Sequence, residues 1–93
     1  YVELINLVVP GTVKYVGKVL AGFNIQNVYF EEGVETIGKS AFNGCKNLYN
    51  VYLPKTLTKI EAEAFYTWNG GPKYFYYEGT LEEWNNINKL LEE

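Results

Sequence analysis

Histidine, aspartate, arginine and methionine are all missing from this chain of 93 residues, which has one serine, Ser40, and one cysteine, Cys45. A Ser/His/Asp or Cys/His nucleophilic arrangement cannot be assembled without those side chains. A zinc site with cysteine and histidine ligands cannot be assembled either. We therefore expect a protein that is not an enzyme and that holds no metal or cofactor.

Long apolar runs and an excess of basic charge are missing as well. No run approaches the roughly 20 residues of a membrane-spanning helix, and the start, YVELINLVVPG, lacks the sectors of a signal peptide. Eight lysines and eleven glutamates are interspersed and give a net charge of −3, so no basic patch is present. The sequence predicts no membrane span in this chain and no nucleic-acid partner.

Aromatic side chains are abundant. Aromatic residues make up 17% of the chain, nine of them tyrosines, within a hydrophobic content of 47% that is typical of a globular protein. A single domain of this size buries about two-thirds of the surface of its unfolded chain. That leaves little room for a deep pocket, so a flat binding surface is the easier site to build.

An internal repeat organises most of the chain. Residues 28–48, VYFEEGVETIGKSAFNGCKNL, align with residues 51–70, VYLPKTLTKIEAEAFYTWNG, at a constant offset of 23. The matched apolar pairs are Val28 and Val51, Phe30 and Leu53, Val34 and Leu57, Ile37 and Ile60, and Phe42 and Phe65. An earlier copy supplies Leu7, Val9, Val13 and Val16 at an offset of 21, and a later copy supplies Phe75, Tyr77, Leu81 and Trp84 at an offset of 24. Four copies therefore share one apolar skeleton.

Each copy predicts the same succession of elements. A short alternating strand leads to a turn, a second short apolar segment and a compact turn such as SAFNGC. One copy cannot bury its apolar face alone, so the copies should stack into a solenoid with parallel strands about 4.8 Å apart. We expect residues 1–79 to form this solenoid, beginning in mid-repeat, as part of a single domain. Cys45, which aligns with Trp68, should be buried in its core.

The C-terminal segment, residues 80–93, predicts a helix that caps the array. Thr80 and Glu83 form the sequence pattern of a capping box. Trp84, Ile87 and Leu91 recur on one face of such a helix. An apolar face at this place would close the open end of the stack.

Residues 33–40, GVETIGKS, match the phosphate-binding loop pattern and follow a strand-like segment. In the repeat alignment, however, Gly33 is a turn residue and Ile37 a core residue. A phosphate-binding loop also needs a long following helix, which Gly44 interrupts, and no aspartate is available for Mg²⁺. We interpret the match at Gly33–Ser40 as coincidental and predict no nucleotide partner.

The segment from residue 34 to residue 54, VETIGKSAFNGCKNLYNVYLP, resembles the BspA-like leucine-rich repeat. That repeat is marked by aliphatic-x-x-Ile-Gly, Ala-Phe-x-Gly-Cys and Leu-x-x-Val-x-Leu-Pro, and the resemblance extends over about residues 4–84. YYEGTLEEW is similar to a segment often found at the end of such arrays. The resemblance implies an α/β, β-rich fold, a right-handed leucine-rich repeat solenoid of about three to four repeats of 21–24 residues.

The same resemblance implies a function. Proteins with these repeats are usually secreted or attached to the surface of host-associated microbes, and the repeats are taken to bind other proteins. By resemblance, this chain is expected to be an adhesion module of a larger extracellular or cell-surface protein. Its partner would be a protein, such as a host extracellular or serum protein.

Two columns of residues are predicted on the outer face of the longer strands. Side chains alternate along a strand, so the residues between the buried positions point outward. The first column contains Val8, Tyr29, Tyr52 and Tyr76, and the second contains Asn6, Asn27, Asn50 and Tyr74. Tyrosine and asparagine combine rigid contact area with adaptable hydrogen bonding, as binding faces do. We hypothesise that Tyr29, Tyr52, Tyr76, Asn27, Asn50 and Tyr74 contact a protein partner.

The columns have a second interpretation. Aromatic neighbours across strands stabilise a sheet by roughly 0.2 to 1 kcal/mol each, so the columns could serve the stack alone. The chain would then be a structural spacer with no ligand of its own. A spacer is expected to show small polar or charged residues on its strand face, whereas a binding module shows tyrosine, tryptophan or arginine.

Overall fold

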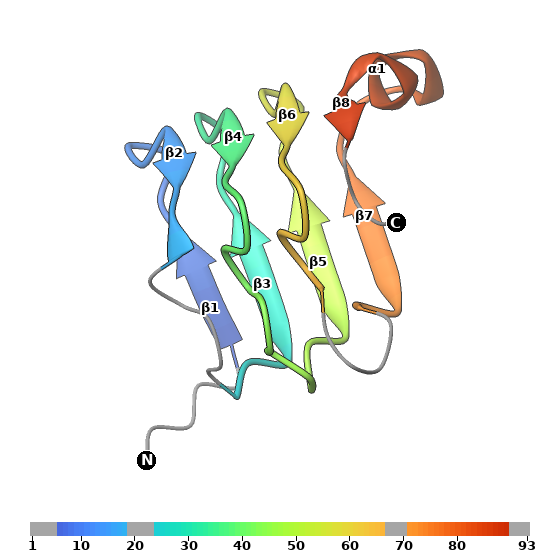
Figure 1. Ribbon diagram of the computed structural model, residues 1–93. Coiled ribbons are helices and arrows are strands. Elements are labelled where there is room, and N and C mark those ends of the chain that lie inside the picture. Colours follow the sequence, from blue (N-terminus) through green and yellow to red (C-terminus); the bar gives the residue numbers. More distant parts are fainter. Residues whose placement is uncertain (1–5, 19–23, 67–70, 90–93) are drawn as a thin grey trace.

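Strands dominate the structure. The computed structural model describes residues 6–18, 24–66 and 71–89. The first sheet contains β1 (Asn6–Val9), β3 (Asn27–Phe30), β5 (Asn50–Leu53) and β7 (Tyr74–Tyr77), and the second contains β2 (Tyr15–Val16), β4 (Thr36–Ile37), β6 (Lys59–Ile60) and β8 (Asn88–Lys89). All neighbouring strands run parallel, and each copy gives one strand to each sheet (Figure 1). The predicted β-rich solenoid is confirmed.

The strand register confirms the offsets read from the sequence. Leu7 pairs with Val28, Val28 with Val51, and Val51 with Phe75, which are offsets of 21, 23 and 24. In the second sheet Val16 pairs with Ile37 and Ile37 with Ile60. Because a slip of one residue would turn each strand's apolar side chains outward, the buried skeleton specifies this register.

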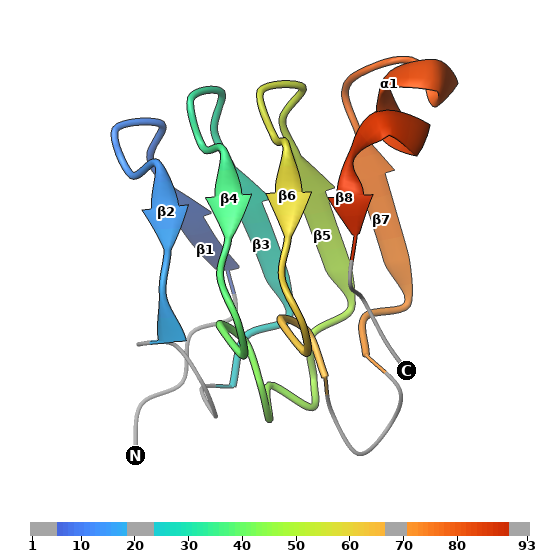
Figure 2. The same ribbon diagram turned by 45° about the horizontal axis from the view of Figure 1, so that its top comes forward.

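The core lies between the two sheets, and in Figure 2 the strands β2, β4, β6 and β8 lie in front of β1, β3, β5 and β7. Val28, Val34, Ile37, Val51 and Ile60 are fully buried, and Cys45 is buried as predicted. Trp68, with which Cys45 was aligned, lies outside the described residues. The first copy is less well covered, since Val13 is 37% exposed although the repeat predicts it in the core. Val13 follows the turn of the outermost described copy, where no described repeat packs over it.

The Ala-Phe blocks form matching turns in the two central copies. Ser40 and Glu63, 23 residues apart, both have a φ of 59°, and each is followed two residues later by a buried phenylalanine, Phe42 or Phe65. The Phe42 amide donates to the Ala64 carbonyl at 2.7 Å, which joins one turn to the next. The turns therefore stack with the strands, and their rings lie 5.4 Å apart between centroids.

The C-terminal segment differs from the predicted helix over residues 80–93. The helix α1 covers only Leu81–Asn86, and Ile87 is an extended C-cap residue before β8. Pairing of Ile60 with Lys89 gives the second sheet its fourth strand, so the predicted core equivalence of Leu81 and Trp84 with Leu57 and Ile60 is wrong. Leu81 is 74% exposed. Leu91, predicted on the same helical face, lies outside the described residues.

The predicted capping box is present. Thr80 Oγ1 accepts from the Glu83 amide at 3.1 Å, and Glu83 Oε1 accepts from the Thr80 amide at 2.9 Å. These bonds place Trp84 against the last strand, with its ring centroid 6.4 Å from that of Phe75 and 5.4 Å from that of Tyr77. Within the described ranges, no helix has both the length and the apolar character needed to cross a membrane.

Candidate functional site

The predicted tyrosine column forms a stack on the outer face of the first sheet. The rings of Tyr29 and Tyr52 lie 4.5 Å apart between centroids at an interplanar angle of 8°, and those of Tyr52 and Tyr76 lie 4.6 Å apart at 13°. Tyr29 is 38% exposed and Tyr76 45% exposed, and Val8 continues the column on β1. Both faces of the Tyr52 ring are covered by its neighbours in the stack, whereas Tyr29 and Tyr76 each stack on one face.

The predicted asparagine column forms a ladder of amide hydrogen bonds. Asn27 Nδ2 donates to Asn6 Oδ1, and Asn50 Nδ2 donates to Asn27 Oδ1, both at 2.8 Å. Asn27 and Asn50 are half-buried. Each side-chain amide has two N–H donors and a carbonyl with two lone pairs, so the ladder leaves part of its hydrogen-bonding capacity for a ligand.

Tyr74 joins the tyrosine stack to further residues that the sequence analysis did not select. Its ring centroid lies 6.1 Å from that of Tyr76 and 5.7 Å from that of Tyr49, which meets it edge-on. Tyr49 is 48% exposed, and Lys73 Nζ lies 6.0 Å from the Tyr74 centroid. The structure thus brings all six predicted site residues onto one face and adds Tyr49 and Lys73 to it.

The position of Tyr49 has a local backbone cause. The amides of Tyr49 and Asn50 both donate to the Gln26 carbonyl, so two consecutive residues lie opposite one residue, as in a β-bulge. Simple alternation of side chains would place Tyr49 on the buried side of β5. Because Tyr49 and Asn50 share one acceptor, the Tyr49 side chain lies on the exposed side instead. The same doubling recurs one repeat later, where Lys73 and Tyr74 both donate to the Tyr49 carbonyl.

Stacking changes the acidity of the central ring. Burial raises the pKa of Tyr52 above its usual value, and the neighbouring Tyr29 and Tyr76 raise it further. The central ring therefore presents a neutral phenol at ordinary pH, beside the side-chain amides of Asn27 and Asn50. Such groups supply contact area and hydrogen bonds.

The outer face of the second sheet is built differently. Tyr15 donates its hydroxyl to Glu61 Oε1 at 3.1 Å and reaches across Gly38, where a Cβ atom would meet the Tyr15 hydroxyl at 2.5 Å. Glu61 also accepts from the Lys39 amide at 3.0 Å and pairs with Lys59 at 3.5 Å. This hydrogen bond raises the pKa of Tyr15, because Glu61 accepts it from the protonated hydroxyl, and the same bond lowers the pKa of Glu61. Tyr15 therefore braces three repeats rather than extending a column.

The segment that matches a phosphate-binding loop has a structural explanation. Residues 33–40 contain a turn, strand β4 and a second turn, and no helix follows them before β5. Their amides donate within the protein: Gly33 to Thr56 Oγ1, Val34 to the Glu31 carbonyl, Glu35 and Thr36 to the Lys14 carbonyl, Gly38 to the Val16 carbonyl, Lys39 to Glu61 Oε1 and Ser40 to the Ala62 carbonyl. A phosphate-binding loop directs such amides at the phosphate, so this geometry supports the interpretation that the match is coincidental.

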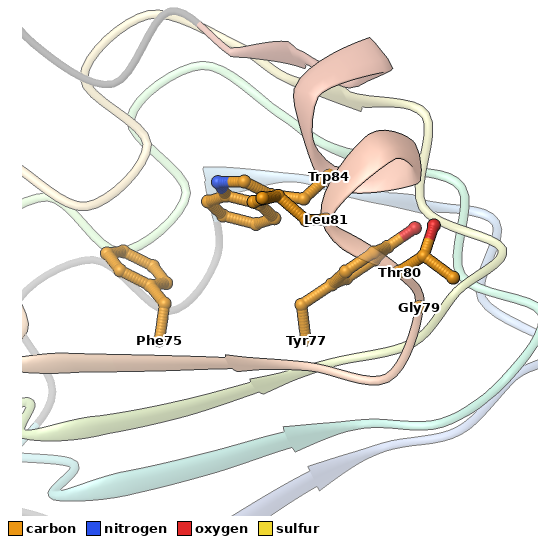
Figure 3. A pocket seen from close by; sticks show the side chains of 6 residues that line it. All are labelled: Phe75, Tyr77, Gly79, Thr80, Leu81 and Trp84. Carbon is orange, nitrogen blue, oxygen red and sulfur yellow. The ribbon is translucent and has the colours of Figure 1, made fainter.

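A cavity of about 300 Å³ lies at the C-terminal end of the array. It is lined by Phe75, Tyr77, Gly79, Thr80, Leu81 and Trp84, and Figure 3 shows the Trp84 ring above the two β7 side chains. Phe75 and Tyr77 point to the core side of β7, so the cavity is on the opposite side of that strand from Tyr74 and Tyr76. Half of its lining residues are aromatic, and none of them is charged.

The parallel two-sheet stack with one repeat per layer is a solenoid, and its repeats define a family. Residues 2–87 match the family model of the BspA-type leucine-rich repeat region, described as six copies. The chain belongs to this family. Neither the comparison with curated proteins nor the comparison with solved structures gave a significant match.

Proposed function

We propose that this chain is a non-enzymatic protein-binding module of a larger secreted or cell-surface protein. In this proposal the outer face of the first sheet contacts the partner through Tyr29, Tyr52, Tyr76, Tyr74, Asn27 and Asn50, with Tyr49 and Lys73 at its edge. The observation that carries it is the tyrosine stack, three nearly parallel rings at spacings of 4.5 and 4.6 Å, of which Tyr29 and Tyr76 are exposed and Tyr52 is half-buried.

The stack favours binding because its rings are already ordered. A tyrosine that is immobilised on binding loses side-chain entropy, and a ring fixed by its neighbours has lost that entropy before the partner arrives. The ladder of Asn27 and Asn50 fixes the adjacent amides in the same way. The face therefore offers rigid contact area beside hydrogen-bonding groups, the mixture that binding faces favour.

The family supports the kind of partner. Leucine-rich repeats commonly mediate protein interactions, and membership of this family suggests that the protein is located at a cell surface. An adhesion role follows as a proposal, with a host extracellular or serum protein as the partner. The competing function is a spacer, in which the stack contributes only to stability, and the following experiment separates the two.

Binding should be lost when the stack is removed without unfolding the protein. The wild type is immobilised and exposed to extracellular-matrix and serum proteins, the captured protein is identified, and its dissociation constant is then measured with purified components. Changing Tyr29→Ser and Tyr52→Ser together should weaken binding at least about 100-fold, as for residues that dominate an interface. A control with Thr36→Ser and Lys59→Ser, on the other sheet, should bind like the wild type.

The folded state of each variant is checked by circular dichroism and thermal unfolding. Undiminished binding by a folded Tyr29→Ser/Tyr52→Ser protein would overturn the proposal and would indicate that the columns only stabilise a structural spacer. Equal losses in both double variants would also overturn it, because the effect would not depend on the face.

A further inference from the structure

The last strand of the first sheet has an open edge. β7 is at the end of the order β1-β3-β5-β7, and no strand among residues 6–18, 24–66 and 71–89 pairs with its outer side. Tyr74 and Glu78 donate their amides to the Tyr49 and Leu53 carbonyls, toward β5. Because backbone groups alternate in direction along a strand, the N–H and C=O groups of Phe75 and Tyr77 point toward the open edge.

We propose that this edge pairs with the same edge of a second copy of the chain, forming a closed two-fold dimer. This pairing does not rest on the proposed partner-binding function, although Tyr74, Tyr76 and Lys73 belong to both surfaces. An open edge is a template for another strand, and the second copy is favoured by the two features described next: the register of the free backbone groups and the charges at the two ends of β7.

The free backbone groups select one antiparallel register. When Phe75 lies opposite Tyr77 of the second copy, both residues direct their N–H and C=O groups at each other and form a hydrogen-bonded pair. The two-fold axis produces this pair twice, giving about four hydrogen bonds. Centring the axis on Phe75 instead would leave only one such pair, of Phe75 with its own copy. The favoured register has the axis at Tyr76, so the tyrosine stack would continue from one copy into the other.

The charges at the two ends of β7 are complementary in this arrangement. Lys73 precedes the strand and lies over Tyr74, and Glu78 follows the strand, with both side chains exposed. In the antiparallel register Tyr74 is opposite Glu78 of the second copy, which brings the Lys73 ammonium beside that carboxylate. The two-fold axis produces this Lys73–Glu78 contact twice in the dimer. A parallel arrangement of the two edges would place like charges together.

The opposite edge of the sheet is a poorer partner for β7. The Val9 carbonyl accepts from Glu31, so β1 directs Val9 toward β3 and Val8 toward the outer edge. At the position of Glu31, whose amide joins β3 to β1, the first copy has Pro10, which has no N–H to donate. Head-to-tail stacking would therefore lack a hydrogen bond at each junction and would also produce open-ended assemblies rather than a dimer.

Sedimentation of the full chain tests the proposal. A four-residue edge makes a small interface of the weak class, so concentrations up to about 0.5 mM are needed. The mass should rise with concentration from 10.7 kDa to about twice that value and then level off. A mass that stays at 10.7 kDa, or one that grows past the dimer, would overturn the closed pairing.

Charge reversal tests the register. Lys73→Glu should raise the dissociation constant of the dimer about five- to tenfold, because two attractive pairs become repulsive. The double change Lys73→Glu and Glu78→Lys should restore wild-type association. Lys46→Glu, on an exposed turn, is the matched control and should have no effect. Equal effects of Lys73→Glu and Lys46→Glu, or failure of the double change to restore dimerisation, would refute this register.

Proline substitution tests the backbone contact itself. The Phe75 amide has no role in pairing with β5, so Phe75→Pro should remove the edge donor and abolish the dimer, whereas Phe75→Val keeps the donor and should still dimerise. Val8→Pro, which removes the corresponding donor at the β1 edge, should leave the dimer intact. Loss of association in Val8→Pro alone would show head-to-tail stacking instead. If Phe75→Pro does not fold, the charge-reversal series still decides the register.

Discussion

Two aromatic columns run across the repeats, one inside the molecule and one outside. The inner column contains Phe30, Phe42, Phe65 and Phe75, with neighbouring centroids 5.4 to 5.8 Å apart and both stacked and edge-on contacts. The outer column contains Tyr29, Tyr52 and Tyr76, all stacked, at 4.5 and 4.6 Å. Phe42 is fully buried, whereas Tyr76 is 45% exposed. The outer rings are therefore stacked more regularly than the inner rings, although the inner rings are more deeply buried.

The two columns differ in what they contribute to folding. Burial of apolar area dominates the favourable free energy of folding, so the inner column should contribute far more to it than the outer column. In-register parallel strands bring like residues together at both places, but only the outer column leaves ring edges and hydroxyl groups in solvent. We infer that the phenylalanines hold the repeats together and that the tyrosines are available to a partner.

The largest effect is expected when the end of the inner column is uncovered. Deleting residues 80–93 removes Trp84 from Phe75 and Tyr77 and removes β8 from β6, where Ile60 is fully buried. The exposed apolar end and strand edge should make the protein aggregate. Light scattering compares the truncated and full chains at equal concentration. An equally stable and equally soluble truncated protein would show that this segment is not a cap.

Truncating one ring in each column compares their contributions to folding directly. Phe42→Ala should lower the free energy of unfolding by about 3 to 5 kcal/mol, the usual cost of removing a buried phenylalanine. Tyr52→Ala should cost at most about 2 kcal/mol, since it removes two cross-strand pairs of roughly 0.2 to 1 kcal/mol each. Urea unfolding of both variants gives the two values. Similar costs would contradict the division of roles.

A smaller change at the same end sharpens the comparison. Thr80→Ala should cost about 1 kcal/mol, because it removes the N-cap acceptor for the Glu83 amide. This loosens α1, which holds Trp84 at the end of the inner column, and leaves the outer column unchanged. Thr12→Ala, in an exposed turn, is the matched control and should change stability by less than about 0.5 kcal/mol. Equal costs of the two changes would show that the capping box contributes nothing measurable.

The smallest effect is expected in the titration of the outer column. Burial, and then Tyr29 and Tyr76, raise the pKa of Tyr52 above the ordinary value of about 10. The resulting stabilisation is fully present below the unfolded pKa and is lost as the pH rises through the folded pKa. Tyr29→Phe should lower this pKa slightly, since it removes a neighbouring phenol, and Tyr29→Ser should lower it more, since it also opens the ring to water. NMR of tyrosine labelled at Cζ gives the values, and identical titrations in the three proteins would contradict a stacked column in solution.

Much of the fold could be predicted from the sequence, because residues that are one repeat apart become neighbours when the repeats stack as parallel strands. The offset of 23 places Val28 beside Val51 without any knowledge of the turns between them. The prediction failed at the C-terminal end, where the capping box is present but the helical spacing had been extended over residues 80–93. Ile87 instead adopts an extended conformation and leads into β8, whose pairing with β6 supplies backbone hydrogen-bond partners beside the buried Ile60. Pairing with a distant strand cannot be read from local periodicity.

The candidate site shows the same limit. Alternation placed Tyr29, Tyr52 and Tyr76 on one face, but the sequence does not encode the ring orientations, which follow from packing at the strand spacing. The sequence analysis missed Tyr49 because the amides of Tyr49 and Asn50 both donate to the Gln26 carbonyl, which breaks the simple alternation of side chains. Nothing in the local sequence marks that irregularity. Whether the six predicted residues contact a partner stays a prediction.

Photo-crosslinking tests most directly whether the outer column is the surface that meets a partner. A photoreactive phenylalanine is placed at Tyr52 in one protein and at Thr36, on the other sheet, in a second, and both are irradiated with the captured partner. The account predicts crosslinks from position 52 and none from position 36. Crosslinks from position 36 alone, or a partner that is captured but crosslinked at neither position, would contradict it.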